Sequence, residues 1–443
     1  MRKEFYEDYF KNKKVTVMGL GLLGRGIGDT AFLVSCGANI VVTDLKNKEQ
    51  LQDSLEILKD YKNIEYHLGG HMMTDFEEKD FILKSAGVPL DSEYIQHAKN
   101  NKIPVAMSAS LVCDIVMKTF PTVTIIGVTG TRGKTTATEL IAHVLRENNS
   151  RVHVGGNIRG VANLPLLEAV EEDDYLVMEL DSWQLQGFGE MKISPHIAVF
   201  TSFMDDHMNY YKNNKGVYFN DKANIYRFQK KEDVLIATNQ VIHEIQKYDS
   251  VRSPVIPKDA YFDMKLIGKH NQEIAGLAYE VCVRCGLDDE SIRNAIKTFS
   301  PTEGRLEDVG VFHGVRVFND NNATTGDATV VAIKSINEKY NTKPIIILGG
   351  TDKGLELINL EKEIKENTKA HILLAGTGTD RLTLSKEHMY ETLEECLNKA
   401  FSLAKEGDII LFSPAFASFS KYFNNEYERN DAFVTLVQSY ATV

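Results

Sequence analysis

The amino-acid sequence predicts an α/β protein of three domains, and three observations support this prediction. A chain of 443 residues is longer than one hydrophobic core usually organises. Short apolar runs, which are typical of buried parallel strands, alternate with helix-like stretches along the whole chain. Two of these runs lead into glycine-rich loops, at residues 19–24 and 127–133. We place the domain boundaries after residues 112 and 300.

The first domain, residues 1–112, opens with a strand–helix–strand pattern. Residues 15–19 and 39–44 are typical of strands, and further strand-like runs lie near residues 80–83 and 103–107. Between the first two strands, Gly19-x-Gly21-x-x-Gly24 followed by Asp44 matches a dinucleotide-binding fingerprint. The domain is therefore expected to be Rossmann-like, which leaves a nicotinamide-linked oxidoreductase as an alternative function.

The second domain, residues 113–300, contains the more specific loop, Gly127-Val-Thr-Gly-Thr-Arg-Gly-Lys-Thr135. A strand precedes it and an amphipathic helix follows it, as a phosphate site needs. Lys134 supplies a cation and Thr135 a metal-directed hydroxyl, although Val128 stands where a strict Walker A motif has glycine. Later apolar runs at residues 175–180, 196–201 and 234–237 complete a P-loop ATPase-like parallel sheet.

Two polar residues follow strands of this sheet. Glu179 ends one predicted strand and His207 follows the next, so both are expected at the edge where parallel α/β sheets bind ligands. A carboxylate there suits a hard cation such as Mg²⁺ or Mn²⁺ beside ATP phosphates. Either residue alone would more often be a solvated surface residue.

The third domain, residues 301–443, repeats the alternation, with strand-like runs at residues 315–318, 345–348, 372–375 and 409–412. It is expected to be a second Rossmann-like domain.

Composition excludes several classes of protein. The net charge of −12 argues against a nucleic-acid binder. The sequence has no signal-peptide pattern and no apolar run of the ~20 residues that cross a bilayer, so we expect a cytoplasmic protein without membrane contact. Five scattered cysteines predict reduced thiols, and Cys282-x-x-Cys285 lies in a helix-like stretch, residues 274–286, where a structural role is favoured over metal binding.

The loop G-x-x-G-T-x-G-K-T resembles the ATP loop of the Mur ligase and folylpolyglutamate synthase superfamily. Lys222, fifteen residues after His207, resembles the lysine that Mur ligases carbamylate. The resemblance implies an ATP-dependent, ADP-forming carboxylate–amine ligase with two Mg²⁺ ions, Mn²⁺ being possible in their place. The implied catalytic residues are Lys134, Glu179, His207 and Lys222, and the implied metal ligands are Thr135, Glu179, His207 and Lys222. The implied ATP contacts are Gly130, Thr131, Arg132, Gly133, Lys134, Thr135, Thr136, Asn271, Arg305 and Asp320.

The first domain resembles that of the Mur ligases that add D-glutamate to UDP-N-acetylmuramoyl-L-alanine, whereas folylpolyglutamate synthases do not begin with such a domain. The resemblance implies this reaction, through an acyl phosphate, in peptidoglycan precursor synthesis, with these two substrates as partners of a monomer. The implied substrate contacts are Leu23, Asp44, Lys46, Ser85, Asn157, Thr324, Lys353 and Ser418. Departures at Arg132, Asn322 and residues 107–110, and a longer segment at residues 424–429, leave the amino acid open, so another Mur-type or polyglutamate ligase is an alternative.

Overall fold

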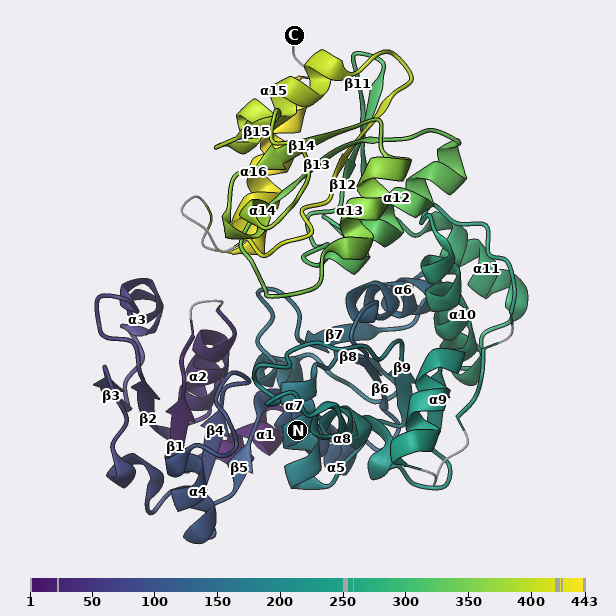
Figure 1. Cartoon of the computed structure of the whole chain (residues 1–443). Helices are drawn as coiled ribbons and strands as arrows, with labels where there is room; N and C mark the ends of the chain where they lie inside the picture. Colours follow the sequence, from purple (N-terminus) through teal and green to yellow (C-terminus); the bar gives the residue numbers. More distant parts are fainter. Residues whose placement is uncertain are drawn as a thin grey trace. The chain divides into compact units, whose positions relative to one another are not determined.

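The computed structural model describes residues 2–21, 24–249, 254–257, 259–418, 423 and 425–440, with side chains from residue 5 onwards (Figure 1). The chain forms two compact units. The first unit comprises Met1–Ala260 and Ile274–Ala295, and the second comprises Tyr261–Glu273 and Ile296–Val443.

The first sheet is entirely parallel and has the order β3-β2-β1-β4-β5. Its strands are β1 (Lys14–Met18), β2 (Asn39–Asp44), β3 (Ile64–Leu68), β4 (Phe81–Lys84) and β5 (Val105–Ala106). The helical segments of this part are α1 (Arg2–Phe10), α2 (Arg25–Ser35), α3 (Gln52–Leu58), η1 (Met73–Phe76), α4 (Glu93–Asn100) and α5 (Ser108–Thr119). The chain order reverses between β1 and β4, which is the point where open α/β sheets bind ligands.

The second sheet is also parallel, with the order β10-β9-β6-β8-β7. Its strands are β6 (Thr124–Thr129), β7 (Val152–Gly156), β8 (Tyr175–Glu179), β9 (Ile197–Phe200) and β10 (Val234–Ala237). The helical segments around it are α6 (Lys134–Glu147), η2 (Leu164–Glu168), α7 (Ser182–Met191), α8 (Lys215–Arg227) and α9 (Asn239–Tyr248). The division between the two units runs through α10 (Lys269–Arg284) and α11 (Asp289–Thr298).

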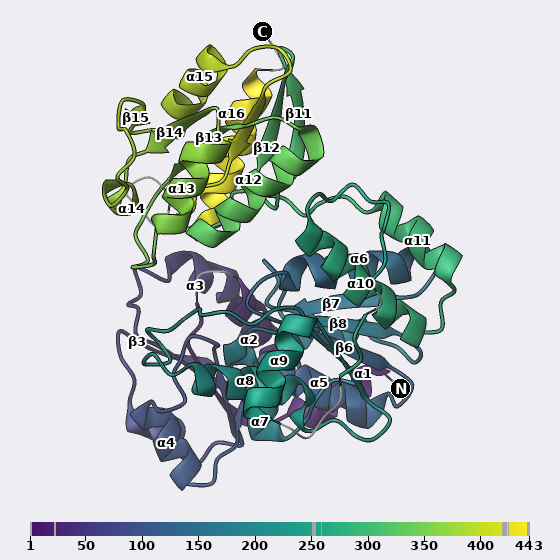
Figure 2. The same cartoon turned by 45° about the vertical axis from the view of Figure 1, so that its right-hand side comes forward.

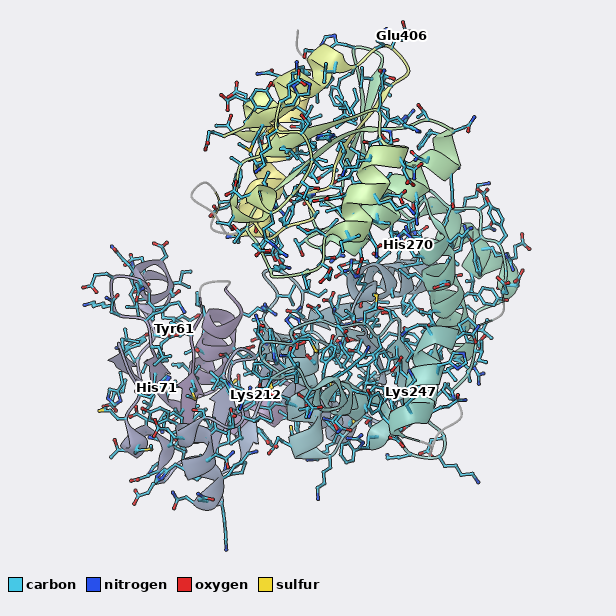
Figure 3. The ribbon with its side chains drawn as sticks, viewed as in Figure 1. Tyr61, His71, Lys212, Lys247, His270 and Glu406 are labelled. Atoms are coloured by element: carbon cyan, nitrogen blue, oxygen red, sulfur yellow. The ribbon has the colours of Figure 1, made fainter. Side chains whose placement is uncertain are left out.

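One hydrophobic core joins the two sheets of the first unit. It includes Val15 and Val17 of β1, Val112 and Val116 of α5, and Ile125 of β6, all buried. Helix α5 therefore belongs to the interior that both sheets share, and side chains fill the space between them (Figure 3).

The sheet of the second unit has the order β11-β12-β16-β13-β14-β15, and only β11 pairs in the antiparallel direction. The strands are β11 (Glu307–Phe312), β12 (Val315–Asn319), β13 (Ile345–Gly349), β14 (Ala370–Leu374), β15 (Met389–Tyr390) and β16 (Ile409–Phe412). The helices are α12 (Gly326–Tyr340), α13 (Ile358–Asn367), α14 (Thr377–Asp380), α15 (Leu393–Leu403) and α16 (Glu426–Ser439). Alternate residues of β13 enter two cores: Ile346 packs with α12 and α13 on one face, and Ile347 with α15 and α16 on the other (Figure 2).

The structure confirms the α/β class, and the expected strand-like runs coincide with twelve of its strands. Strands β3, β7, β11 and β15 were not expected. The helix-like stretch at residues 274–286 is part of α10, and its two thiols are free, as are Cys36, Cys113 and Cys396. Residue 112 lies within α5, and residue 300 lies beyond α11; the domain boundaries stay predictions. Within the described part of the chain, no helix is long and apolar enough to cross a membrane.

Candidate active site

The predicted phosphate loop, residues 127–135, connects the central strand β6 to helix α6. The residues that follow the neighbouring strand β9 hold it in place. The N–H groups of Thr131 and Arg132 donate to the backbone oxygen and the Oγ of Ser202, both at 2.8 Å. The Thr131 hydroxyl lies 3.2 Å from the Met204 carbonyl oxygen. These two N–H groups are therefore used inside the protein, whereas the first N–H groups of α6, including that of Thr136, have no acceptor within the helix. The N-terminus of α6 is therefore the end of the loop that is suited to an anion.

Gly130 is the tightest position of the loop. Its φ of +153° is rare for other residues, and a Cβ there would lie 2.0 Å from Thr201 Oγ1 and 2.9 Å from the Ser202 nitrogen. Gly133 precedes α6 with φ of +80°, also in the left-handed region. The two glycines allow the chain to turn from β6 into α6 against residues 201–202.

We expect Gly130→Ala to lower the free energy of unfolding by about 2 kcal/mol or more, because both the backbone and the neighbouring atoms must shift. Gly69→Ala is the matched control, since Gly69 has φ of +85° but no atom within 4 Å of the added Cβ. Its cost is about 1 kcal/mol, from the backbone alone. Urea unfolding of the two variants measures the difference, and equal losses would show that the loop is not tightly packed.

Two lysines meet at the loop. Lys134 Nζ donates to the carbonyl oxygens of Gly130 at 3.1 Å and Thr131 at 3.2 Å. Lys222 of α8 is 1% exposed, and its Nζ donates to the same Gly130 oxygen at 2.8 Å. Burial, and next the charge of Lys134, hold the pKa of Lys222 well below its usual value of 10.5. The Lys222 amine is thus held in a form that loses its charge readily.

Glu179 lies at the C-terminal end of β8 and is 3% exposed. Its Oε1 is 3.5 Å from Asn157 Nδ2, and the Asn157 N–H donates to the Glu179 backbone oxygen at 2.7 Å. The other carboxylate oxygen, Oε2, is buried without a hydrogen-bond partner among the described residues. A buried carboxylate oxygen without a donor is suited to a cation.

His207 has an unusual backbone conformation for a residue other than glycine, with φ of +54°. Its ring lies 4.6 Å from the ring of Trp183, between centroids. Partial burial lowers the pKa of His207. The negative charge of Asp206 opposes this shift, and the positive charges of Lys134 and Lys222 add to it. The imidazole is therefore favoured in its neutral form, which has a free nitrogen lone pair for a metal.

The first unit thus brings the four predicted catalytic residues to the loop. Lys134 and Lys222 donate to the same Gly130 oxygen, and Glu179 pairs with Val128 across strands β8 and β6. The ring of Tyr218 lies 6.5 Å from the ring of His207 and 5.1 Å from Lys222 Nζ. No group of three or more His, Cys, Asp or Glu side chains in the described ranges is arranged to hold a metal. A metal site at this loop would therefore need a ligand other than His, Cys, Asp or Glu. The predicted ligands Thr135 and Lys222 are of that type.

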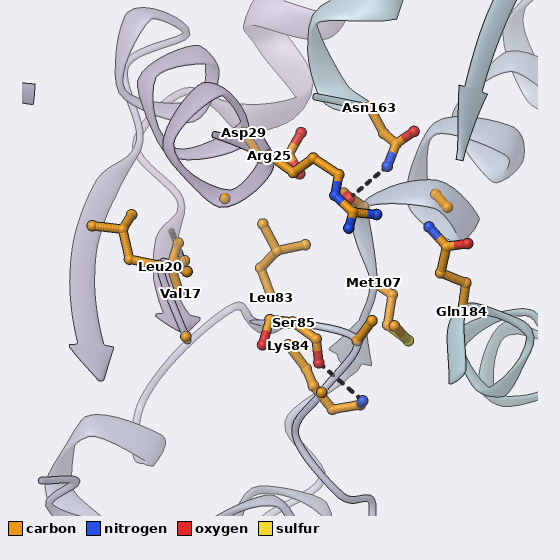
Figure 4. A pocket seen from close by; sticks show the side chains of 17 residues that line it. Val17, Leu20, Arg25, Asp29, Leu83, Lys84, Ser85, Met107, Asn163 and Gln184 are labelled. Carbon is orange, nitrogen blue, oxygen red and sulfur yellow. Dashed lines mark hydrogen bonds between the residues drawn. The ribbon is translucent and has the colours of Figure 1, made fainter. Parts of the chain in front are cut away.

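A cavity of about 220 Å³ lies in the first unit beside the chain reversal of the first sheet (Figure 4). The loops after β1 and β4 line it, and Ser85 lies so close to Gly19 that a Cβ there would be 2.5 Å from the Ser85 Oγ. Asp44 does not line this cavity; it accepts the N–H groups of Leu20 at 2.9 Å and Lys46 at 2.9 Å. Asp44 therefore holds the backbone at Leu20, directly after β1.

The cavity also contains two cationic residues that sequence reasoning missed, Arg25 of α2 and Lys84 of β4. Lys84 is 2% exposed, and its Nζ donates to the carbonyl oxygens of Val88 at 2.7 Å and Ser85 at 3.2 Å. Burial lowers the pKa of Lys84 to about 8, against the charges of Asp181 and Asp221. Neither residue has a sequence signal, because its neighbours come from distant parts of the chain.

The lowered pKa of Lys84 predicts a dependence of stability on pH. An unfolded lysine has a pKa of about 10.4, so between about pH 8 and about pH 10.4 the unfolded chain binds the extra proton and stability rises with pH. We expect wild type to gain about 3 kcal/mol relative to Lys84→Met over this range. Chemical unfolding of both proteins at several pH values measures this gain, and parallel curves would contradict it.

The second unit brings together the predicted residues Arg305, Asp320, Thr324, Lys353 and Ser418 in the loops at one end of its sheet. Asp320 follows β12, and its two carboxylate oxygens lie 3.1 Å from the Leu306 nitrogen and 2.8 Å from the Ser413 Oγ. Lys353 Nζ donates to Thr324 Oγ1 at 2.9 Å. Asp320 thus holds the segment that carries Arg305 against the end of the sheet.

Asn271 lies in the first turn of α10, in the part of that helix that belongs to the second unit, and its Nδ2 donates to the Ile267 carbonyl oxygen at 2.7 Å. Leu23 lies outside the described residues, as does Asn424 of the segment at residues 424–429. In that segment, Arg429 is 1% exposed and its Nε donates to Asn321 Oδ1 at 2.8 Å, so it ties α16 to the loop after β12.

Family models match two parts of the chain. The model for "Mur ligase MurD-like, N-terminal domain" matches residues 13–107, and that for "Mur ligase middle domain" matches residues 128–256. Two solved structures from Thermotoga maritima share the fold at low identity: UDP-N-acetylmuramate-alanine ligase MurC (TM-score 0.61, 19% identity, covering 96% of this chain and 99% of that one) and MurF ligase in complex with ADP (TM-score 0.61, 15% identity, covering 91% and 95%).

Full-length relatives are more similar in sequence. A protein of Borreliella afzelii named UDP-N-acetylmuramoylalanine--D-glutamate ligase is 33% identical, with 97% of this chain and 98% of the relative covered. A protein of the same name from Roseiflexus sp. is 31% identical, with 97% and 99% covered. Since the similarity extends over both units and all three sheets, the chain belongs to the Mur ligase family.

Proposed function

We propose that the protein is an ATP-dependent, ADP-forming ligase that joins D-glutamate to UDP-N-acetylmuramoyl-L-alanine in peptidoglycan precursor synthesis. The observation that carries this proposal is the position of Lys134, Glu179, His207 and Lys222 around one glycine-rich loop. Relatives that cover nearly the whole chain and bear the name of this activity support the choice of substrates.

The reaction needs ATP because a carboxylate does not react with an amine while its leaving group would be oxide or hydroxide. Transfer of the γ-phosphoryl group to a carboxylate oxygen of the acceptor releases ADP and gives an acyl phosphate. The amino nitrogen of D-glutamate then forms a bond to the acyl carbon, and phosphate leaves with the former carboxylate oxygen while the nitrogen gives up a proton. Lys134 and the N-terminus of α6 are suited to hold the phosphates during this transfer.

Magnesium ions would supply positive charge beside the phosphates when they are bound. The unpartnered Oε2 of Glu179 supports this part of the proposal, because it is a buried oxygen that a hard cation can use. Thr135, His207 and Lys222 are the other proposed ligands, and two ions are proposed for them to share. Lys222 can serve as such a ligand only after its amine has been converted into an anionic group.

Carbamylation would give Lys222 that charge. An uncharged amine forms a bond from its nitrogen to the carbon of CO₂ and releases a proton, which leaves a carbamate anion. The burial of Lys222 and the nearby Lys134 both lower the pKa of the amine, and this supports the reactive, uncharged form. The same Lys134 cation would stabilise the carbamate once it has formed.

We assign the acceptor to the first unit and D-glutamate to the second. Leu23, Asp44, Lys46, Ser85 and Asn157 are the proposed acceptor contacts, and the 220 Å³ cavity that Ser85 lines supports the choice of Ser85. Thr324, Lys353 and Ser418 are proposed for D-glutamate, because Lys353 is a cation that can pair with its carboxylate.

Nucleotide binding would involve both units. Asn271, Arg305 and Asp320 of the second unit are proposed to contact ATP, and so are the loop residues 130–136 of the first unit. Domain boundaries after residues 112 and 300, a monomeric state and a cytoplasmic location remain part of the proposal.

An amino-acid panel tests the substrate assignment. The purified protein is supplied with ATP, Mg²⁺ and UDP-N-acetylmuramoyl-L-alanine, and phosphate release is measured with D-glutamate, L-glutamate, L-alanine or diaminopimelate. We expect release with D-glutamate alone. Release with another amino acid but not with D-glutamate would overturn the assignment.

A further inference from the structure

We propose that Arg25 is a positioning residue for the metal site, because it fixes the amide orientation of Asn157 and thereby the hydrogen bond that Asn157 gives to Glu179. The inference rests on the proposed role of Glu179 as a metal ligand. It links helix α2, which follows the glycine loop of the first sheet, to the carboxylate at the end of β8 in the second sheet.

The contact between Arg25 and Asn157 is short and joins distant parts of the chain. Arg25 begins α2, and its Nη1 donates to Asn157 Oδ1 at 2.6 Å over a separation of 132 residues. Figure 4 shows the Arg25 side chain extending from α2 across the cavity toward the side where Asn163 and Gln184 lie. Asn157 follows the last residue of β7, the strand that pairs with β8 along its full length up to Glu179.

The chemistry of the guanidinium decides which way the amide faces. A guanidinium has only donors, so it can bind the oxygen end of the Asn157 side chain and not the nitrogen end. With Oδ1 held by Arg25, Nδ2 faces Glu179 and lies 3.5 Å from Oε1. The reversed amide would bring its oxygen to the carboxylate, and two acceptors would then face each other.

This orientation of the amide gives the two carboxylate oxygens of Glu179 different surroundings. Oε1 lies next to the Asn157 amide, while Oε2 stays buried without a partner among the described residues. A carboxylate held at one oxygen presents the other in a fixed direction, which lowers the entropy that a bound cation must remove. Arg25 thus orients the proposed metal ligand Glu179 through Asn157, which lies between the two residues.

The first half of α2 is fixed against residues 162–164 by contacts that do not involve Asn157. The Leu164 nitrogen donates to Asp29 Oδ1 at 2.8 Å. A Cβ added to Gly28 would lie 2.6 Å from the Ala162 Cβ, so the helix backbone passes close to this segment. These contacts hold the Arg25 backbone in place. A variant that removes one of them therefore serves as a control for a purely structural effect.

The test measures Mn²⁺ binding by isothermal titration calorimetry to the full chain in the presence of ADP, so that it does not depend on turnover. We expect Arg25→Met to weaken Mn²⁺ binding about tenfold and Arg25→Lys, which keeps a donor, to restore most of the loss. In an Asn157→Ala background, Arg25→Met should cause no further loss, because the residue through which it acts is absent. Asp29→Ala is expected to lower the melting temperature and leave Mn²⁺ binding unchanged.

The outcomes separate this inference from the proposed function. If Glu179→Gln loses Mn²⁺ but Arg25→Met binds it as wild type does, the positioning role is wrong and the metal ligand stands. Additive losses from Arg25→Met and Asn157→Ala, or an Asp29→Ala loss equal to that of Arg25→Met, would also overturn the positioning role. If Glu179→Gln binds Mn²⁺ as wild type does, the metal assignment fails and the inference fails with it.

Discussion

Lys222→Ala is expected to lower kcat by about 10³-fold, and a short carboxylic acid such as acetate is expected to restore part of the activity. The substitution removes the proposed carbamate and leaves a void at a site where the side chain is 1% exposed. Acetate can enter that void and supply the missing carboxylate oxygens. Phosphate release at saturating ATP, with and without acetate, measures both effects.

Rescue by different small molecules distinguishes the two forms of Lys222. If the lysine acts as an ammonium group, methylamine and not acetate should restore activity, and this result would contradict the carbamate. Unchanged turnover in Lys222→Ala would contradict any catalytic role. Lys247→Ala is the matched control, because Lys247 lies on α9 and pairs with Glu244 at the surface (Figure 3).

Lys134→Met is expected to lower kcat by about 10³-fold as well, with little change in the free energy of unfolding. In the structure its Nζ contacts only the carbonyl oxygens of Gly130 and Thr131 among the contacts described, so folding depends little on it. The loss of the cation would instead slow phosphoryl transfer, because negative charge develops on the phosphoryl group in the transition state. Single-turnover ADP formation checks the rate, and a variant with more than about a tenth of wild-type kcat would contradict this role.

The fold was predictable where burial is complete. Strands β6, β8, β9, β13 and β16 are continuous apolar runs because helices cover both faces of their sheets. Strand β3 is only half-buried, and its sequence Ile-Glu-Tyr-His-Leu mixes polar with apolar residues. Strand β11 is an edge strand that pairs antiparallel to β12 with a bulge near Asp308, so its pattern is weak as well.

The site was predictable where a residue type stands at a fixed place on an element. Glu179 could be expected because carboxylates at the ends of parallel strands face the ligand edge, and the loop before α6 has a specific glycine and lysine spacing. Lys222 lies in the middle of α8 and has no local signal, so only the family resemblance pointed to it. Arg25 and Lys84 could not be found from sequence, because their roles depend on contacts that the fold creates across the first unit.

Isotope transfer from the acceptor carboxylate tests the central claim most directly. UDP-N-acetylmuramoyl-L-alanine with ¹⁸O in both carboxylate oxygens is incubated with the protein, ATP, Mg²⁺ and D-glutamate, and the released phosphate is analysed by mass spectrometry. Formation of an acyl phosphate predicts ADP together with phosphate that carries a single ¹⁸O atom. Unlabelled phosphate alongside the peptide product would contradict activation of the carboxylate by ATP.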